Sequence, residues 1–265
     1  MDFNKIVKKL SKSPSKVFDL EDIAEFVDPG FARGEGGKRD AYKLVYRLKS
    51  QGILMPIRNG LYQRTDDPYE KDPYDDVRAV EDAYWKIVKK LITKNCGANY
   101  VVAGSKALEI RMRDLSIPDT LIVYTKDLTS VLTVSERHRV VFQMAKTGAK
   151  TGRNNAFPVF AEFAETFEID GLKFKIAGIE HAILDALIVH KRTPADTYAV
   201  TKFVSKYSKA VRRDALGKLV ACKYLTAINR LREIARDKGD SVLYEKALDV
   251  VKREGGNCFV SGGNR

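Results

Sequence analysis

The sequence has 265 residues, of which 44% are hydrophobic and 31% are charged, and its 47 Lys and Arg exceed its 35 Asp and Glu by twelve. This length accommodates two domains, and the positive surplus favours a polyanionic partner, either nucleic acid or an acidic protein surface. No apolar run approaches the ~18 residues of a membrane helix, and the N-terminal segment lacks the apolar stretch of a secretion signal. The three cysteines, Cys96, Cys222 and Cys258, are too scattered for a metal knuckle or a disulfide framework, so we expect a cytoplasmic protein.

The N-terminal residues show the pattern of three helices followed by a hairpin. Asp19 is a good N-cap for the second helix, and Gly52 is a typical end for the third. Asn59-Gly60 is the strongest short hairpin signal. We interpret the glycine-rich turn at 30–37 as a flexible approach to the third helix. The predicted elements are helices over 2–11, 19–27 and 38–51, and strands over 53–57 and 60–63.

The third helix has two chemically different faces. Its apolar face repeats at i, i+3, i+4 and i+7 and consists of Ala41, Leu44, Val45 and Leu48. The opposite face carries Lys38, Arg39, Lys43, Arg47 and Lys49, with Tyr42 and Tyr46 between them. A basic helix followed directly by a hairpin with Arg58 at its tip is the layout of a winged helix-turn-helix, in which the helix enters the DNA major groove and the wing lies along the backbone. The alternative is a merely solvated face, but the order of the elements favours DNA binding.

A second domain is predicted after an acidic, proline-containing linker at residues 66–76. We place the winged-helix domain at 1–65, the second domain at 77–255 and a flexible tail at 256–265. The predicted elements of the second domain are a helix over 77–94, a strand over 99–103 that breaks at Gly104-Ser105 into a helix, strands over 120–124, 129–134, 138–144, 157–163 and 172–177, and helices over 178–190, 195–206, 208–221, 222–237 and 240–253. The predicted fold class is α+β, with a small sheet and a helical C-terminal end.

The Gly104-Ser105 turn is the most enzyme-like feature of the sequence. Nucleotidyltransferases hold nucleotide phosphates at such a turn, and they need a pair of closely spaced carboxylates to bind two metal ions. Here Asp114, Asp119 and Asp127 are isolated. The missing pair argues against catalysis, and we predict no catalytic residue and no cofactor.

Histidines offer little support for a metal site. His181 and Asp185 are four residues apart on one helix, and His190 follows, but no third ligand is evident. Ser105 lacks the sequence context of a nucleophile. We therefore interpret His181 as a structural residue and predict no metal.

A second basic surface is predicted in the C-terminal third. Residues 202–253 contain fourteen Lys and Arg against six Asp and Glu. The basic residues behind this surplus form a solvated face, a second DNA contact or a docking surface for an acidic partner protein. The sequence leaves all three interpretations open. The residues concerned are Lys202, Lys206, Lys209, Arg212, Arg213, Lys218 and Lys223.

Three segments resemble the AbiEi antitoxin family of type IV toxin–antitoxin systems, over about residues 3–235. They are LKSQGILMPIRNGLYQR at 48–64, YVVAGSKALEIRM at 100–112 and GIEHAILDAL at 178–187. The resemblance implies a winged-helix repressor, which binds inverted repeats in its own promoter, fused to a domain that neutralises a nucleotidyltransferase toxin. Direct contact with the toxin stays open.

The resemblance also implies which residues contact double-stranded DNA. The expected contacts are Lys38, Arg39, Tyr42, Lys43 and Arg47 on the third helix, Arg58 and Asn59 on the wing, and Arg64 at the end of the second wing strand. The glycine-rich approach at 30–37 and the basic loop at 145–158, which is a candidate phosphate contact, depart from the family pattern. The alternatives are a nucleotidyltransferase-like enzyme that uses Gly104-Ser105, and a winged-helix module that binds a protein.

Overall fold

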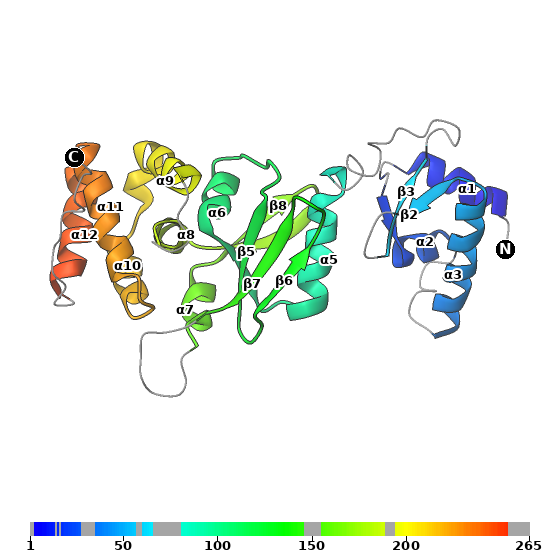
Figure 1. Ribbon diagram of the computed structural model, residues 1–265, viewed down its shortest axis with the longest axis horizontal. Coiled ribbons are helices and arrows are strands. Elements are labelled where there is room, and N and C mark those ends of the chain that lie inside the picture. The colour runs from blue at the N-terminus through cyan, green and yellow to red at the C-terminus, as the bar shows by residue number, and fades with distance from the viewer. Residues whose placement is uncertain are drawn as a thin grey trace. The chain divides into compact units, whose positions relative to one another are not determined.

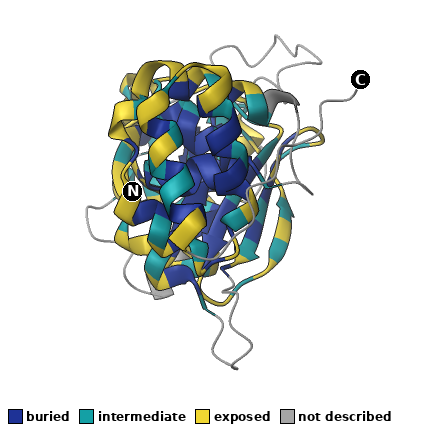
Figure 2. Cartoon of the chain, turned by 90° about the vertical axis from the view of Figure 1, so that its left-hand side faces the viewer, coloured by how far each residue is buried: buried dark blue, intermediate teal, exposed yellow. Residues whose placement is uncertain are grey.

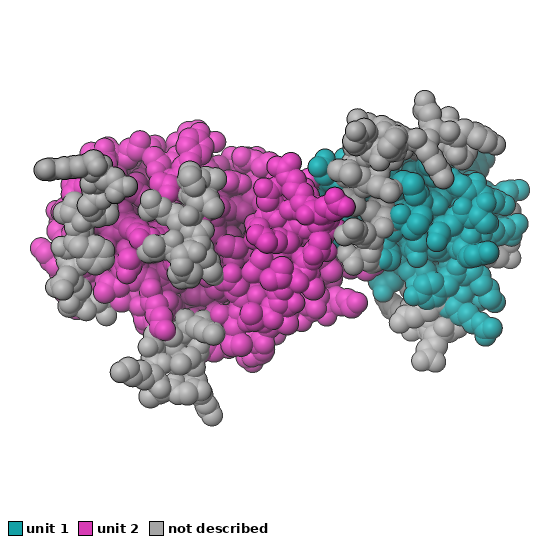
Figure 3. Space-filling view, viewed as in Figure 1, with its two compact units in different colours: residues 1–87 teal, residues 88–265 magenta. Residues whose placement is uncertain are grey.

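The computed structural model describes residues 3–13, 15, 17–27, 35–56, 60–65, 81–145, 155–188 and 194–253, with the backbone alone at 35–38 and 194–195. The chain divides into two compact units, residues 1–87 (unit 1) and 88–265 (unit 2) (Figure 3). The predicted linker at 66–76 lies outside the described residues.

Unit 1 has the element order of a winged helix-turn-helix. Its three strands form an antiparallel sheet in the order β1-β3-β2, so the wing hairpin β2-β3 is extended by the strand that precedes the second helix (Figure 1). The elements are α1 (Phe3–Lys12), β1 (Val17–Asp19), α2 (Leu20–Val27), α3 (Glu35–Ser50), β2 (Leu54–Pro56) and β3 (Leu61–Arg64). The predicted helices and wing strands are confirmed, whereas β1 was not predicted.

The core of unit 1 joins every one of these helices to the sheet. It contains Ile6, Leu10, Phe18, Ile23, Leu44, Val45, Leu48 and Leu54. The apolar face predicted for the third helix is this core face, since Ala41 and Leu48 are fully buried. Burying a Leu or Ile side chain contributes roughly 1.5–3 kcal/mol, so the core determines which face of α3 remains outside.

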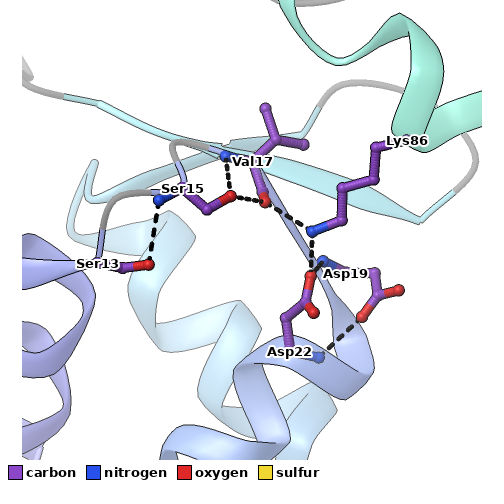
Figure 4. Close-up of polar contacts among 6 residues, drawn as sticks. All are labelled: Ser13, Ser15, Val17, Asp19, Asp22 and Lys86. Atoms are coloured by element: carbon purple, nitrogen blue, oxygen red, sulfur yellow. Dashed lines mark hydrogen bonds and ion pairs between the residues drawn. The ribbon is translucent and has the colours of Figure 1, made fainter. Parts of the chain in front are cut away.

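Two aspartates fix the start of α2. The Asp22 amide donates to Asp19 Oδ1, and the Asp19 amide donates to Asp22 Oδ2, both at 2.8 Å (Figure 4). This reciprocal pair is a capping box, with Asp in place of the usual Glu at the third position. The Lys86 ammonium also donates to Asp22 and, at 2.8 Å, to the carbonyl of Val17. The predicted N-cap role of Asp19 is thus confirmed.

Unit 2 contains a mixed six-stranded sheet. The strand order is β6-β7-β5-β4-β9-β8, with β4–β9 and β5–β7 parallel and the other neighbours antiparallel (Figure 1). The strands are β4 (Tyr100–Ala103), β5 (Thr120–Thr125), β6 (Ser130–Thr133), β7 (Arg139–Met144), β8 (Glu165–Ile169) and β9 (Leu172–Ile176). The α+β fold class and the central sheet are confirmed.

Helices of unit 2 are layered around one buried helix, α8. Each α8 residue from Glu180 to Ala186 is buried, and α8 packs against α6, α9, α10 and α11. The C-terminal helices of unit 2 are exposed on their outer faces (Figure 2). The bounds are α5 (Tyr84–Cys96), which crosses the unit boundary, α6 (Gly104–Arg111), α7 (Phe157–Glu162), α8 (Ile179–Ala186), α9 (Pro194–Tyr207), the 3-10 helix η3 (Ser208–Ala210), α10 (Arg213–Val220), α11 (Leu225–Asp237) and α12 (Ser241–Arg253).

One predicted strand, 157–163, is wrong. These residues form α7, because Pro158 suits the first turn of a helix and Asn155 accepts a hydrogen bond of 2.9 Å from the Phe157 amide. Phe157 and Phe160 are buried three residues apart, which is a helical spacing, although aromatic residues in so short a segment also favour a strand.

The neighbouring strand β8 was missed, although the sequence carries a signal for it. Asp170 and Gly171 both have positive φ, 50° and 73°, and join β8 to β9. Asp-Gly is a strong two-residue hairpin signal. Other corrections are local: α3 includes residues 35–37 of the predicted flexible turn, and the helix predicted at 208–221 is divided into η3 and α10. Among the described residues, no helix is both long and apolar enough to cross a membrane.

Candidate nucleic-acid interface

The face of α3 opposite the core is exposed along its length. Because an α-helix repeats every 3.6 residues, one stripe lies directly opposite Ala41 and Leu48. This α3 stripe consists of Arg39, Lys43, Tyr46 and Ser50. Tyr42 and Lys49 flank it on one side and Arg47 on the other, so an exposed basic and aromatic surface follows from the burial of the apolar face.

Two tyrosines on this surface are unusually exposed. The exposed fraction of Tyr42 is 60% and that of Tyr46 is 75%. Burial raises the pKa of Tyr62 on β3, and the nearby Tyr42 phenol raises it further, which places Tyr42 beside the wing sheet. Phenol hydroxyls contact DNA phosphates and sugars in many complexes. The set predicted from the sequence omitted Tyr46, although its position seven residues after Arg39 places it on the same stripe.

The cations on α3 differ in the contacts that they make with the rest of the chain. Arg39 and Lys49 are exposed and form no ion pair with any described residue. Lys43 makes an exposed ion pair of 3.3 Å with Asp40, an arrangement that is worth little in water. The Arg47 guanidinium lies 4.2 Å from the centroid of the Phe3 ring, so α1 holds it in place through a cation–π contact.

Arg64 has a structural role instead. Its Nη1 donates to the carbonyls of Leu10 at 2.6 Å, Ser13 at 3.1 Å and Ser11 at 3.3 Å. Leu10 and Ser11 lie in the last turn of α1 and Ser13 follows it. The carbonyls at the end of a helix lack the next turn of amide donors, although the Leu10 carbonyl also accepts the Ser13 amide at 3.1 Å, and a cation is favourable at this end. We therefore remove Arg64 from the set of expected DNA contacts. The side chain of Lys38, the wing residues Arg58 and Asn59, and the central part of the 145–158 loop lie outside the described residues.

The predicted second basic surface is divided by ion pairs. Arg212 pairs with the buried Glu180 at 3.3 Å, and its backbone amide donates to the same carboxylate at 2.7 Å. Arg213 pairs with Asp249 at 2.8 Å, and Lys218 pairs with Glu162. The exposed cations without an ion pair to a described residue are Lys202, Lys206, Lys209 and Lys223.

The Gly104-Ser105 turn joins β4 to α6. Gly104 has a positive φ of 71°, and a Cβ at this position would lie 3.4 Å from the Ile122 side chain of β5. The same Cβ would lie 3.6 Å from Asp185 Oδ2 of α8, so the turn packs against one apolar side chain and one buried carboxylate. Asp119 pairs with Arg137 at 2.7 Å, and Asp114 accepts a hydrogen bond from the Ser116 amide at 3.1 Å. These interactions give both carboxylates partners of their own.

Lys106, next to this turn, is a buried cation that the sequence did not single out. Its ammonium donates to Glu109 Oε2 at 2.9 Å, Ser116 Oγ at 3.1 Å and the Asp114 carbonyl at 3.2 Å. With its three donors engaged, it ties α6 to the segment that follows it.

His181 and Asp185 lie inside an aromatic cluster. The His181 ring stacks on Phe160 at 3.8 Å between centroids, and neither ring nitrogen has a hydrogen-bond partner among the described residues. Burial lowers the pKa of His181 to about 3, so the imidazole is neutral. Tyr124 and Tyr224 both donate to Asp185 Oδ1, at 2.6 and 3.2 Å. Within the described part of the chain, no group of three or more His, Cys, Asp or Glu side chains is arranged to hold a metal ion.

Comparisons with known proteins give a fold and no family. No protein-family model matches the sequence, and no curated protein matches it. The structure is similar to the crystal structure of the RV2827C protein from Mycobacterium tuberculosis, with a TM-score of 0.52 and 13% sequence identity over 93% of this chain and 80% of that chain. At this identity the similarity concerns the fold alone.

Proposed function

We propose that unit 1 binds double-stranded DNA through the α3 stripe and that the chain represses transcription from its own promoter. One observation carries the proposal: the third helix of a winged helix-turn-helix presents Arg39, Lys43 and Tyr46 together on its outer face. The 16 residues of α3 extend over about 24 Å, and the major groove of B-DNA is wide enough to admit a helix.

The positive charge of the N-terminal residues and the fixed position of Arg47 support this proposal. Residues 1–65 contain thirteen Lys and Arg against eight Asp and Glu. The described part of the α3 surface, residues 39–50, contains four cations and one carboxylate, Asp40. Arg47 is already ordered on Phe3, so less side-chain entropy is lost when it meets a phosphate.

The deciding experiment measures binding of the full chain to its own upstream DNA by fluorescence anisotropy, with random-sequence duplex as competitor. Replacing Arg39 and Lys43 together by alanine should weaken specific binding by about 1–3 kcal/mol for each side chain that meets the DNA. The matched control is Lys94→Ala with Lys238→Ala, which removes the same charge from exposed positions of unit 2 and should leave binding unchanged. Equal affinities for all three proteins would remove Arg39 and Lys43 from the interface.

The antitoxin part of the proposal rests on the resemblance of residues 100–112 and 178–187 to the AbiEi family. We propose that unit 2 neutralises a nucleotidyltransferase toxin and has no catalytic role of its own. Co-expression with a neighbouring toxin gene tests the first statement by cell growth. Mg²⁺-dependent labelling of RNA or protein by nucleoside triphosphates, abolished in Ser105→Ala, would contradict the second.

A further inference from the structure

One helix face of unit 2 combines cations with an exposed aromatic ring. The inner face of α9 is buried through Ala199, Val200, Phe203 and Val204. Opposite this face lie Tyr198 and Lys202; Lys206 follows one turn later, at the flank of the buried face, and Lys209 lies in η3. We name these four exposed residues the α9 stripe. The Tyr198 ring is 67% exposed, with the Lys202 ammonium 5.9 Å from its centroid.

Negative charge is missing from this part of the chain. From Thr197 to Arg213 the sequence contains five Lys and Arg and no Asp or Glu. A solvated helix face normally intersperses Glu with Lys at i, i+4 spacing. Two carboxylates lie near the stripe, and both are engaged. Asp114 is hydrogen-bonded by Ser116, with a smaller electrostatic attraction to Lys202, and Asp240 is hydrogen-bonded to Ser208 and to the Leu243 amide.

Ion pairs that follow the stripe in sequence limit the unpaired cations of this region to α9 and η3. Arg212 and Arg213 follow the stripe directly, but both are paired, with Glu180 and Asp249. Lys218 on α10 is likewise paired with Glu162. A duplex lying across α9 and α10 would therefore meet paired cations and exposed carboxylates, and this arrangement disfavours a broad phosphate-binding surface.

We infer that the α9 stripe docks an acidic segment of a partner protein. Lys202 and Lys206 are about 6 Å apart along the helix axis, and carboxylates have about the same spacing when they are four residues apart on a helix or two apart on a strand. Tyr198 supplies the aromatic anchor that is enriched in protein interfaces, and the lysines accelerate encounter with an acidic surface. The inference does not depend on DNA binding by α3.

The test titrates the ¹⁵N-labelled full chain with a short polyglutamate peptide and, separately, with random-sequence duplex DNA. Polyglutamate should shift the backbone amides of residues 196–210, and Lys206→Ala with Lys209→Ala should weaken its binding roughly two- to thirtyfold, the range for two exposed ion pairs. The matched control, Arg213→Ala with Lys218→Ala, removes the same charge from paired cations and should change the affinity by less.

Three results would overturn the inference. Polyglutamate that leaves the α9 amides unshifted shows that the stripe is a solvated face. Equal reductions in affinity in the two double variants show that only net charge attracts the peptide. Duplex DNA that shifts the α9 amides at lower concentration than polyglutamate assigns the stripe to nucleic acid. The variant Arg39→Ala with Lys43→Ala should retain the peptide-induced shifts at α9, so failure of DNA binding by α3 is distinguished from failure of this inference.

Discussion

Three polar residues of the buried helix α8 are accommodated in three different ways. Glu180 accepts the Arg212 backbone amide and pairs with its guanidinium. Asp185 accepts two tyrosine hydroxyls, whereas His181 is stacked on Phe160 as a neutral ring. Because an unpaired charge would be costly in this place, the neutral state of His181 makes the fold sensitive to acid.

Stability should fall in mild acid because of His181. The folded-state pKa of about 3 lies below the ordinary value of 6.5, so between these values the unfolded chain binds a proton that the folded chain does not. The contribution is fully present above pH 6.5 and is lost as the pH falls, by at most about 1.4 kcal/mol per pH unit. In His181→Phe this slope should disappear, measured by urea unfolding from pH 7 to about pH 4.

Comparing slopes makes this test insensitive to the packing cost of the larger ring. Carboxylates that titrate in the same range are common to both proteins and cancel in the difference. Parallel curves for the wild type and His181→Phe would contradict the lowered pKa, because they would show that the imidazole binds its proton as readily in the folded state as in the unfolded state.

At the scale of elements, short polar contacts position the helices of unit 1. The Asp19–Asp22 capping box begins α2, and Arg64 closes the end of α1. Both helices share the core with α3.

The capping box should be worth a measurable amount of stability. Asp19→Ala removes the acceptor for the Asp22 amide and should lower the free energy of unfolding by about 0.5–2 kcal/mol. Asp19→Asn retains an acceptor oxygen and should be much less destabilised. The measurement is urea denaturation of the full chain followed by tryptophan fluorescence, with Trp85, the single tryptophan, in unit 1. Equal destabilisation of the two variants would show that charge, and not the hydrogen bond, is responsible.

At the scale of the whole molecule, the net charge of +12 is distributed unevenly among accessible sites. Arg212, Arg213 and Lys218 each have a carboxylate partner within the chain. The lysines of the α9 stripe and Arg39 of the α3 stripe are exposed and have no ion pair with a described residue. Association with a polyanion should therefore depend on a few residues more than on the total charge.

Salt dependence of DNA binding measures this distribution directly. Each phosphate contact makes the slope of log K against log salt concentration more negative by about 0.9. The variant Arg39→Ala with Lys43→Ala should therefore have a slope that is shallower by roughly 1.8, and Lys94→Ala with Lys238→Ala should retain the wild-type slope. Fluorescence anisotropy at several salt concentrations gives both values, and an unchanged slope in the first variant would mean that neither residue meets a phosphate.

Much of the fold was predictable because it depends on local pattern. The apolar period of residues 41–48 indicated both the helix and its buried face, and alternating or uninterrupted apolar runs indicated five of the strands in unit 2. The exposed α3 stripe follows from the same period, since whatever lies opposite a buried face of a helix is exposed. The error at α7 occurred where the local signal of an aromatic segment was ambiguous, whereas β8 was missed although Asp170-Gly171 marks its hairpin.

Only the tertiary structure decided which cations are available to a partner. Arg64 is 54 residues from the carbonyl of Leu10 that it caps, and Arg212 and Lys218 are 32 and 56 residues from their carboxylate partners. No local period encodes such contacts, because they depend on which distant segments the folded core brings together. For this protein the sequence by itself determined the α+β class and the basic face of the third helix, and folding determined which of the described positive charges have a carboxylate or carbonyl partner.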